Sequence, residues 1–540
     1  MEGLRFFDAN AWIGQPVFDP ESGSFTRYAT ARDLLEAMDF YGVERALVSH
    51  YRCLFGNPMP ANHRLIEELA GSPRLQPCWT LLPEQTGEAP AGRELAAALR
   101  RSGVRAVRLE PGPFNLVFHE RTLGALLAVL EREGVLLILQ LPTLGVPVPE
   151  KEDVYLRALD ELCGEHPLLN VVAGGRLRNL YPLMKRHARL FTSLAWDPHP
   201  DFVEDVCRRF GAERLLFATP YSENAREISG MPMMQIAHAA ISDREKARIA
   251  GGNLAELLGL EAAPAERAPS GPAARKRPSE FERLLAGRPS PYPIIDVHAH
   301  AGPFSWEYKP ACGLEELLAV MDRLGVQKVW VNATEAVLGG DHLRANEELS
   351  GALRGREARF TGLAVINPHF ADPERYIRRC VEELGFRGIK IHPRVHRCAI
   401  ADPKFEPVWK ASETYRLPVL CHTGQGQAFS EPDQFDGVAA AHPRGIFILG
   451  HTGETFAGIR QCIALANRYG NVYLDLSGWG FMNRGYLEYL ARRVDPARIL
   501  FGSDYAWIDL RYAAATVLFS ELDETIKRLI LGENARRLLA

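Results

Sequence analysis

Long apolar segments are missing from this sequence of 540 residues. No uncharged apolar run approaches the ~20 residues that a bilayer-spanning helix needs. The most apolar stretch, 123–141, is interrupted by Glu131, Arg132 and Glu133. The first residues also lack the basic region and apolar stretch of a signal peptide. These absences predict a cytoplasmic protein without a membrane partner.

A strong charge imbalance and paired cysteines are missing as well. The formal net charge of −4 gives no electrostatic reason to expect nucleic acid as a partner. The 9 cysteines are scattered and form no Cys-x-x-Cys pair, which argues against a disulfide framework and a zinc finger. The hydrophobic share of 46% and the charged share of 24% are ordinary for a globular protein.

One stretch, 261–291, is rich in alanine, proline, arginine, serine and glycine, a composition typical of an exposed linker between domains. It separates residues 1–260 from residues 292–540. Two domains also agree with the ~100–250 residues that one domain usually contains.

The two parts repeat each other, because similar segments follow in the same order. The pairs are 6–14 with 294–302, 38–43 with 321–326, 103–111 with 385–393, 214–220 with 498–504, and 249–253 with 530–534. Chance similarity between two unrelated α/β domains is the alternative. The shared order favours an internal duplication.

Each copy alternates short apolar runs with amphipathic helical stretches. Continuous apolarity indicates strands buried on both faces, as in parallel sheets. About eight such units in roughly 250 residues predict an α/β fold with two (β/α)8 TIM-barrel domains in tandem. A doubly wound open sheet is the competing architecture, but no Gly-x-Gly-x-x-Gly follows the first strand to favour it.

Ionisable side chains follow several predicted strands of the second copy. His298 and His300 share one face of the first strand, since residues i and i+2 point to the same side. The other strand ends are followed by His392, His422, His451 and Asp504. Each could be an ordinary hydrogen-bonded residue. Together they predict one metal site, because such groups are costly after buried strands unless they are paired or ligated.

The second copy resembles the amidohydrolase superfamily, in particular the amidohydrolase-related branch that includes small-acid decarboxylases and lactone hydrolases. The resembling segments are 296–300, 418–424, 449–453, 501–505 and 532–539. The resemblance implies that His298, His300, His422 and Asp504 hold a divalent ion, most simply zinc, with manganese or another divalent ion as alternatives. It makes His451 the unligated catalytic histidine.

The chemistry that this implies starts from a metal-bound water, whose pKa falls toward ~7. Asp504 can take the proton of that water, and His451 can act as a general acid or base. Asp296 is a candidate for a residue behind the ligands, with a structural role as the alternative. Lys390 shares a strand face with His392. Some superfamily members carbamylate such a lysine to bridge two metals, but one ion is the simpler interpretation.

Substrate contacts are expected from residues that follow the strands. His392 and Arg394 could bind a carboxylate or a phenolate. Trp306, with Tyr308, Trp479 and Trp507, could form the wall for an apolar or aromatic substrate, or could pack against the barrel rim.

The first copy has lost the predicted ligands. Asn10, Trp12, Glu110, Gln140, Gly175 and Pro220 stand where the second copy has His298, His300, His392, His422, His451 and Asp504. Tryptophan, glycine and proline side chains cannot ligate. We therefore expect a degenerate barrel without the catalytic metal. It could form an intramolecular pseudo-dimer with the second barrel, and the chain could assemble further into a homo-oligomer.

The leading prediction is a metal-dependent hydrolase that cleaves a C–N or C–O bond of a small organic substrate through a metal-activated water. The first alternative is a nonoxidative decarboxylase of a small aromatic or unsaturated acid. The second alternative is a noncatalytic binding or scaffold protein, which the first copy alone would fit. Fold resemblance does not separate these functions.

Overall fold

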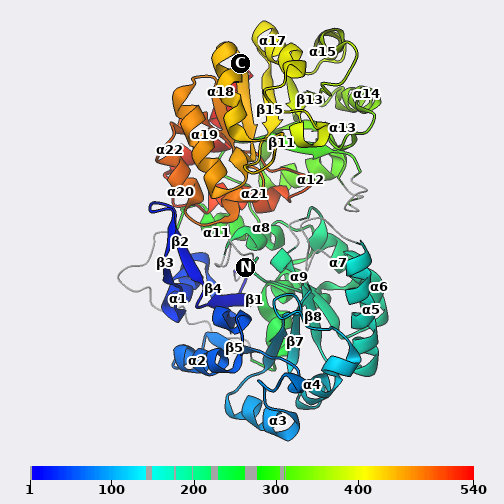
Figure 1. The fold of residues 1–540 in the computed structure, drawn as a ribbon, viewed down its shortest axis with the longest axis vertical. Coiled ribbons are helices and arrows are strands. Elements are labelled where there is room, and N and C mark those ends of the chain that lie inside the picture. The colour runs from blue at the N-terminus through cyan, green and yellow to red at the C-terminus, as the bar shows by residue number, and fades with distance from the viewer. Residues whose placement is uncertain are drawn as a thin grey trace. The chain divides into compact units, whose positions relative to one another are not determined.

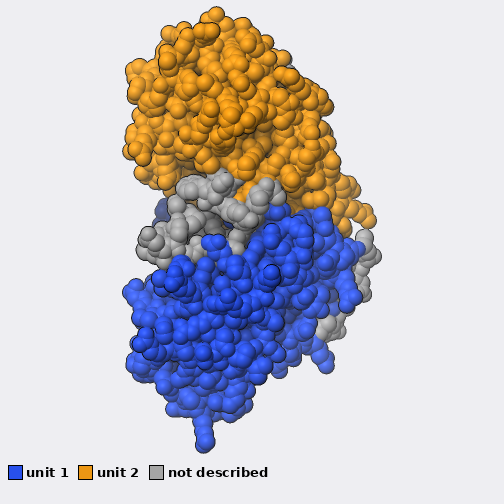
Figure 2. Space-filling model, turned by 90° about the vertical axis from the view of Figure 1, so that its right-hand side faces the viewer, with its two compact units in different colours: residues 1–277 blue, residues 278–540 orange. Residues whose placement is uncertain are grey.

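The computed structural model describes residues 3–141, 149–174, 178–196, 199–220, 229–261, 277–303, 309 and 312–539. The chain forms two compact units, Met1–Arg277 and Pro278–Ala540, coloured separately in Figure 2. In the described part of the chain, no helix combines the length and the apolar character needed to cross a membrane.

The first unit contains a parallel eight-stranded sheet whose strands follow the chain order (Figure 1). The strands are β1 (Phe6–Ile13), β4 (Val43–His50), β5 (Leu75–Thr80), β6 (Ala106–Leu109), β7 (Leu136–Gln140), β8 (Val171–Gly174), β9 (Leu190–Ser193) and β10 (Leu215–Leu216). The amide of Ala9 donates to the carbonyl of Phe217 at 3.1 Å, which closes the sheet into a barrel. A hairpin of β2 (Pro16–Asp19) and β3 (Ser24–Tyr28) follows the first strand.

The second unit repeats this sheet in the same order. Its strands are β11 (Ile294–Ala301), β12 (Val326–Ala333), β13 (Phe360–Val365), β14 (Gly388–Ile391), β15 (Pro418–His422), β16 (Ile446–Gly450), β17 (Val472–Asp475) and β18 (Ile499–Leu500). Here the amide of Val297 donates to the carbonyl of Phe501 at 3.0 Å. The prediction of two (β/α)8 barrels in tandem is therefore confirmed.

Helices alternate with these strands in both units. The first unit has α1 (Ala31–Tyr41), α2 (Met59–Leu69), α3 (Gly92–Arg101), α4 (Glu120–Glu133), α5 (Pro149–Glu165), α6 (Tyr181–Arg186), α7 (Phe202–Phe210), α8 (Met231–Ala237), α9 (Asp243–Ala247) and α10 (Asn253–Leu257). The second has α11 (Phe281–Leu285), α12 (Leu314–Leu324), α13 (Thr334–Val337), α14 (His342–Leu353), α15 (Pro373–Glu382), α16 (Pro393–His396), α17 (Glu406–Tyr415), α18 (Phe435–Ala441), α19 (Phe456–Arg468), α20 (Tyr486–Ala491), α21 (Leu510–Leu518), α22 (Glu524–Arg528) and α23 (Asn534–Leu538).

Corresponding helices of the two units end for the same reason in the sequence. Helices α1 and α12 both end at a glycine in the left-handed region, Gly42 with φ 71° and Gly325 with φ 81°. Glycine adopts this conformation without the steric penalty of a Cβ atom and stops the helix. Met38 and Met321 occupy the same position one turn earlier, and both are fully buried against their barrels.

Buried side chains fill the barrel interiors and form the two cores. In the second unit the core side chains are Ile295, Val297, Trp330, Leu363, Leu420, Ile448, Leu500 and Ala535. Ala535 comes from α23, so the last helix covers the amino-terminal end of the barrel strands. A packed interior leaves the carboxyl ends of the strands as the place for chemistry.

A buried carboxylate closes each barrel in the same way. Asp8 accepts from the amide of Thr219 at 2.9 Å and from its hydroxyl at 2.6 Å. Asp296 accepts from the amide of Ser503 at 3.0 Å and from its hydroxyl. Since the copy without metal ligands keeps this carboxylate, Asp296 joins the first strand to the last rather than serving the site.

The boundary between the units lies earlier than the sequence indicated. Part of the expected linker, 262–276, lies outside the described residues, but residues 278–291 belong to the second unit. Phe281 of α11 is buried, and its ring lies 4.7 Å from that of Phe519. Lys527 donates to Glu280 at 2.9 Å, also in the interior. This short helix packs on the second barrel, so the linker prediction extended too far.

Candidate metal centre

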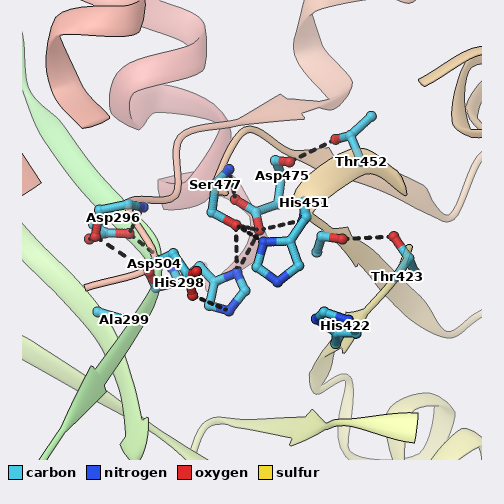
Figure 3. A network of polar contacts seen from close by, with 12 residues as sticks. Asp296, His298, Ala299, His422, Thr423, His451, Thr452, Asp475, Ser477 and Asp504 are labelled. Carbon is cyan, nitrogen blue, oxygen red and sulfur yellow. Dashed lines mark hydrogen bonds and ion pairs between the residues drawn. The ribbon is translucent and has the colours of Figure 1, made fainter. Parts of the chain in front are cut away.

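The candidate site lies at the carboxyl ends of the strands of the second barrel, as Figure 3 shows. His298 and His300 come from β11 and His422 ends β15. His451 follows β16, and Asp504 lies just beyond β18. All five side chains are largely buried in the protein, although they come from four different strand ends.

Asp504 brings two of the predicted ligands together. Its Oδ1 lies 3.1 Å from Nε2 of His300 and 3.5 Å from Nε2 of His298. Two ligand atoms that bind one zinc ion at ~2.0–2.1 Å in tetrahedral geometry lie ~3.4 Å apart. The spacing and the mixture of imidazole and carboxylate therefore fit a divalent ion.

The outer nitrogens of both imidazoles are already engaged. Nδ1 of His298 lies 2.6 Å from Oδ2 of Asp475. Nδ1 of His300 lies 2.7 Å from Oδ1 of Asn332, whose amide nitrogen donates to the carbonyl of Ala299 at 3.0 Å. Because these partners accept, each ring carries its proton on Nδ1 and turns the lone pair of Nε2 toward Asp504. Such partners commonly orient metal-binding histidines.

His451 belongs to the same group. One set of ligand atoms within 4.8 Å of one another consists of His298, His451 and Asp504. The ring of His451 lies 4.9 Å from that of His298 and 4.8 Å from that of His422. Burial lowers the pKa of His451 to about 4, so its imidazole is neutral near pH 7.

His422 and Asp504 both have ligand atoms near those of His451, but they belong to different sets of neighbouring residues. Nε2 of His422 lies 3.0 Å from Oε1 of Gln427, whose amide donates to Glu454 at 2.7 Å. A second set of ligand atoms within 4.8 Å contains His422, His451 and Glu454. The predicted ligands thus fall into two adjoining groups that share His451.

A buried lysine lies inside the centre. Nζ of Lys390 donates to Nε2 of His298 at 2.7 Å, and its side chain is 1% exposed. Burial lowers the pKa of Lys390 to about 8. The sequence placed Lys390 on one strand face with His392, and the structure adds that its ammonium group contacts His298.

The charge of Asp504 is set by its neighbours. Burial alone would raise the pKa of its carboxyl, but its interactions with the surrounding imidazoles, those of His451 and His300 foremost, outweigh that effect and hold the pKa below its ordinary value. The carboxylate therefore stays ionised. A neutral histidine cluster around one fixed anion is suited to a cation.

The expected substrate contacts surround this cluster. His392 stacks on His422 with ring centroids 4.0 Å apart. Arg394 is exposed, and its charge opposes the effect of burial that raises the pKa of Glu454 to about 7. Trp507 makes an edge contact with His300 at 4.6 Å, and Trp479 is 42% exposed. Trp306 and Tyr308 lie outside the described residues.

Sequence reasoning missed several residues of the centre. Asn332 and Asp475 lie at the ends of β12 and β17, so the rule that found the histidines applied to them too. Ser477, Gln427 and Glu454 lie in loops, where no periodic pattern marks them. Their importance follows only from the side chains that they contact.

An arginine lies at the matching place in the first barrel. Arg108 is the counterpart of Lys390 and is 1% exposed. Its guanidinium donates to Asn10 at 2.9 Å and to Ser49 at 3.1 Å, and it lies 4.7 Å from the ring of Trp12. Glu110 lies 3.4 Å away. Among the described residues, both groups with metal-ligand geometry lie in the second barrel.

Similar solved structures cover about one barrel of this chain. A 5-carboxyvanillate decarboxylase from Sphingomonas paucimobilis has 18% identity and a TM-score of 0.38 over 46% of this chain and 99% of its own. A 2,6-dihydroxybenzoate decarboxylase from Rhizobium has 20% identity and a TM-score of 0.38 over 46% and 98%. A dihydroxybenzoic acid decarboxylase from Polaromonas sp. JS666, solved with manganese, has 20% identity and a TM-score of 0.38 over 46% and 97%.

Comparisons of sequence reach both halves of the chain. None of the curated proteins matches it. A family model described as Amidohydrolase, however, matches residues 6–260 and again residues 295–540. The chain therefore belongs to the amidohydrolase family, with two consecutive copies of the family's domain, of which the second has the complete set of candidate ligands.

Proposed function

We propose that the second barrel is a metal-dependent enzyme that removes CO₂ from a small aromatic or unsaturated acid without oxidation. The observation that carries this proposal is the pair of cationic side chains beside the imidazoles. Lys390 is buried among them, and Arg394 is exposed close to Glu454. Cations at a site favour an anionic substrate, and an arginine can bind a carboxylate through two hydrogen bonds.

The proposed ligands of the divalent ion are His298, His300, His422 and Asp504, with zinc and manganese as the first candidates. A bound ion would neutralise and polarise oxygen atoms of the acid. His451 would carry the proton that replaces CO₂. Its Nδ1 contacts Ser477 at 3.0 Å, so its Nε2 is left to take a proton from solvent and to deliver it to the substrate carbon.

The test is a measurement of released CO₂ with protein loaded with zinc or manganese. The first probes are 2,6-dihydroxybenzoate and 5-carboxyvanillate, followed by other hydroxybenzoates and unsaturated acids. We expect one CO₂ for each molecule of decarboxylated product, and loss of both in the His451→Gln variant and after chelation. Turnover without CO₂ would refute the proposal.

Hydrolysis, which the sequence favoured, is the second candidate. The neutral imidazole of His451 beside the ionised Asp504 would suit the activation of a water molecule. Incubation with lactones and amides in H₂¹⁸O distinguishes it, since a hydrolase incorporates the label into the product acid and releases no CO₂. A protein that binds no divalent ion would instead favour a noncatalytic binding role.

For the first barrel we propose a supporting role as the internal partner of a pseudo-dimer. Its Arg108 is paired with Asn10 and Ser49 rather than left free for a ligand. Light scattering of the intact chain tests for further association: one chain per particle supports an internal pair, and an even number would indicate a homo-oligomer.

A further inference from the structure

A single hydroxyl group lies between two imidazoles of the centre. Oγ of Ser477 lies 2.8 Å from Nδ1 of His298 and 3.0 Å from Nδ1 of His451. The same oxygen lies 2.5 Å from Oδ2 of Asp475, which is itself 2.6 Å from Nδ1 of His298. Figure 3 shows this network, and all four side chains are buried.

Asp475 is surrounded by donors. The amide of Ser477 donates to its Oδ1 at 2.9 Å, and the amide of His451 donates to its Oδ2 at 3.3 Å. Two side-chain donors, the hydroxyl of Ser477 and Nδ1 of His298, complete the set. Burial raises the pKa of Asp475, but the hydrogen bonds that it receives oppose that rise and favour the ionised form, in which the carboxylate can only accept.

The count of protons then fixes the direction of every bond. Ser477 has one hydroxyl proton, and it goes to Asp475. Its oxygen must therefore accept from Nδ1 of His451. His298 also donates from Nδ1, mainly to Asp475. Both rings thus carry their proton on Nδ1 and have a lone pair on Nε2, which in His298 faces the ammonium group of Lys390.

We infer that Asp475 and Ser477 form a positioning relay that holds a metal-binding histidine and the proton-carrying histidine in one orientation. The inference rests on the proposed function of His298 and His451. No proton travels along the relay. When Nε2 of His451 takes a proton, the ring becomes cationic, and the bond from Nδ1 to Ser477, backed by the charge of Asp475, stabilises that cation.

The first barrel provides an internal comparison. In the same register, Ser193 ends β9 where Asp475 ends β17, and Ala195 takes the place of Ser477. Features that serve the fold recur in both barrels: Asn62 and Asn346 each bond both backbone groups of the adjacent strand end. Among the described residues of the two barrels, the relay lies beside the imidazoles of the second and has no counterpart at Ser193 and Ala195 of the first, so it belongs to the site.

The relay predicts different effects for its two members. In Ser477→Ala, Asp475 still holds His298, so we expect an unchanged content of bound zinc or manganese. His451 loses its acceptor, so kcat should fall about 10- to 100-fold with little change in KM. The acid limb of the pH–rate profile should also move. Asp475→Asn should lower both the metal content and kcat, because it loosens both rings.

Two controls separate positioning from a loss of folding. Ser477→Thr retains the hydroxyl and should restore the rate and the pH profile. Ser412→Ala removes a buried hydroxyl that bonds the carbonyl of Leu417 at 2.7 Å elsewhere in the barrel. It should lower stability without changing metal content or pH profile. Wild-type kcat and pH profile in Ser477→Ala would overturn the relay, as would equal metal loss in Ser477→Ala and Asp475→Asn.

A second readout does not need a substrate. In protein labelled with ¹⁵N-histidine, the ring nitrogens of His298 and His451 should show the Nδ1–H form, assigned with single histidine variants. Ser477→Ala should change the pattern of His451 and leave that of His298 intact. If both rings show the Nε2–H form, the relay is wrong even if CO₂ is released. If both rings show the Nδ1–H form but no acid is decarboxylated, the relay stands and only the proposed function is refuted.

Discussion

Burial determines the charge of the imidazoles at the candidate centre. Burial lowers the pKa of His298, His300, His422 and His451, so all four rings are neutral near pH 7. Neutral imidazoles are the form that binds a metal ion. At neutral pH the four imidazoles are therefore in the form that can bind a metal ion, and only acid well below pH 7 would protonate them.

This burial predicts a pH-dependent difference between wild type and His451→Asn in the metal-free state. The unfolded histidine has a pKa near 6.5 and the folded one a pKa of about 4, so the unfolded chain binds more protons between these values. Wild type should lose about 2–3 kcal/mol of unfolding free energy relative to the variant between pH 7 and about pH 4.5. Urea unfolding of both proteins measures the difference.

The comparison with the variant is needed, because the pKa values of Glu454 and Asp296 are raised and change the stability with pH in the opposite direction. Burial raises the pKa of each to about 7, so these groups favour the folded state at lower pH and could mask the histidine in wild type alone. A difference between wild type and variant that stays constant with pH would contradict the shift assigned to His451.

Lys390 predicts an effect on metal affinity. Its ammonium group lies 2.7 Å from Nε2 of His298, so it competes for the lone pair and repels a divalent ion. Lys390→Met should bind zinc or manganese about 10-fold more tightly, in titrations against a chelator. Weaker binding would mean that Lys390 contributes to the ligands, as a carbamylated lysine would. Lys527→Met, a buried lysine paired with Glu280, is the control and should leave the affinity unchanged.

At the scale of elements, each unit contains a π-helical turn that packs closely on the start of the first barrel strand. A Cβ atom on Gly251, in the turn Arg248–Gly252, would lie 2.6 Å from the carbonyl oxygen of Arg5. On Gly532, in the turn Leu529–Glu533, it would lie 2.4 Å from that of Pro293. The two turns therefore require glycine for the same steric reason.

Replacement of these glycines by alanine should destabilise the unit that contains each one. We expect a loss of about 1–3 kcal/mol for Gly251→Ala and for Gly532→Ala, as is usual when a packed interior is overfilled. Gly437→Ala is the control, because its position in α18 has open space and the change should favour the helix by about 0.5–1 kcal/mol. Urea unfolding curves give all three values, and no loss in the first two would contradict the packing.

The elements also show what the sequence can reveal of a site. His298, His422, His451 and Asp504 were recognisable because each interrupts or ends an apolar run. Asp475 ends such a run as well, but its role depends on a neighbour that lies 177 positions away in the chain. Aspartate at a strand end is common, and only the order of strands around the barrel shows that it contacts an imidazole.

The domain boundary was misplaced for a similar reason. Helix α11 has 5 residues within a proline-rich stretch, and so short a segment does not indicate in the sequence on which domain it packs. Its place in the second unit follows from the contact of Phe281 with Phe519. The barrels themselves were predictable, since repeated apolar runs and matched landmarks are properties of the sequence alone.

For the whole molecule, the two barrels share a framework but differ in the polar and charged side chains at their centres. The second has imidazoles and carboxylates beside the buried Lys390, and these imidazoles and carboxylates are suited to a cation from solution. The first has Arg108, a covalently attached cation, which bonds Asn10 where the second barrel has His298. Burial raises the pKa of Glu110 to about 7, and the charge of Arg108 opposes that rise. Both centres thus contain a buried cationic side chain, Arg108 or Lys390, but among the described residues the groups with metal-ligand geometry lie in the second barrel.

This difference predicts that the metal bound by the intact chain belongs to the second barrel alone. His298→Ala should abolish the binding of zinc or manganese, as measured by elemental analysis after dialysis. Arg108→Met should retain the full metal content but lose about 3–5 kcal/mol of unfolding free energy, because it leaves the buried Glu110 without its cationic partner. If His298→Ala retained metal that Arg108→Met lost, the ion would lie in the first barrel.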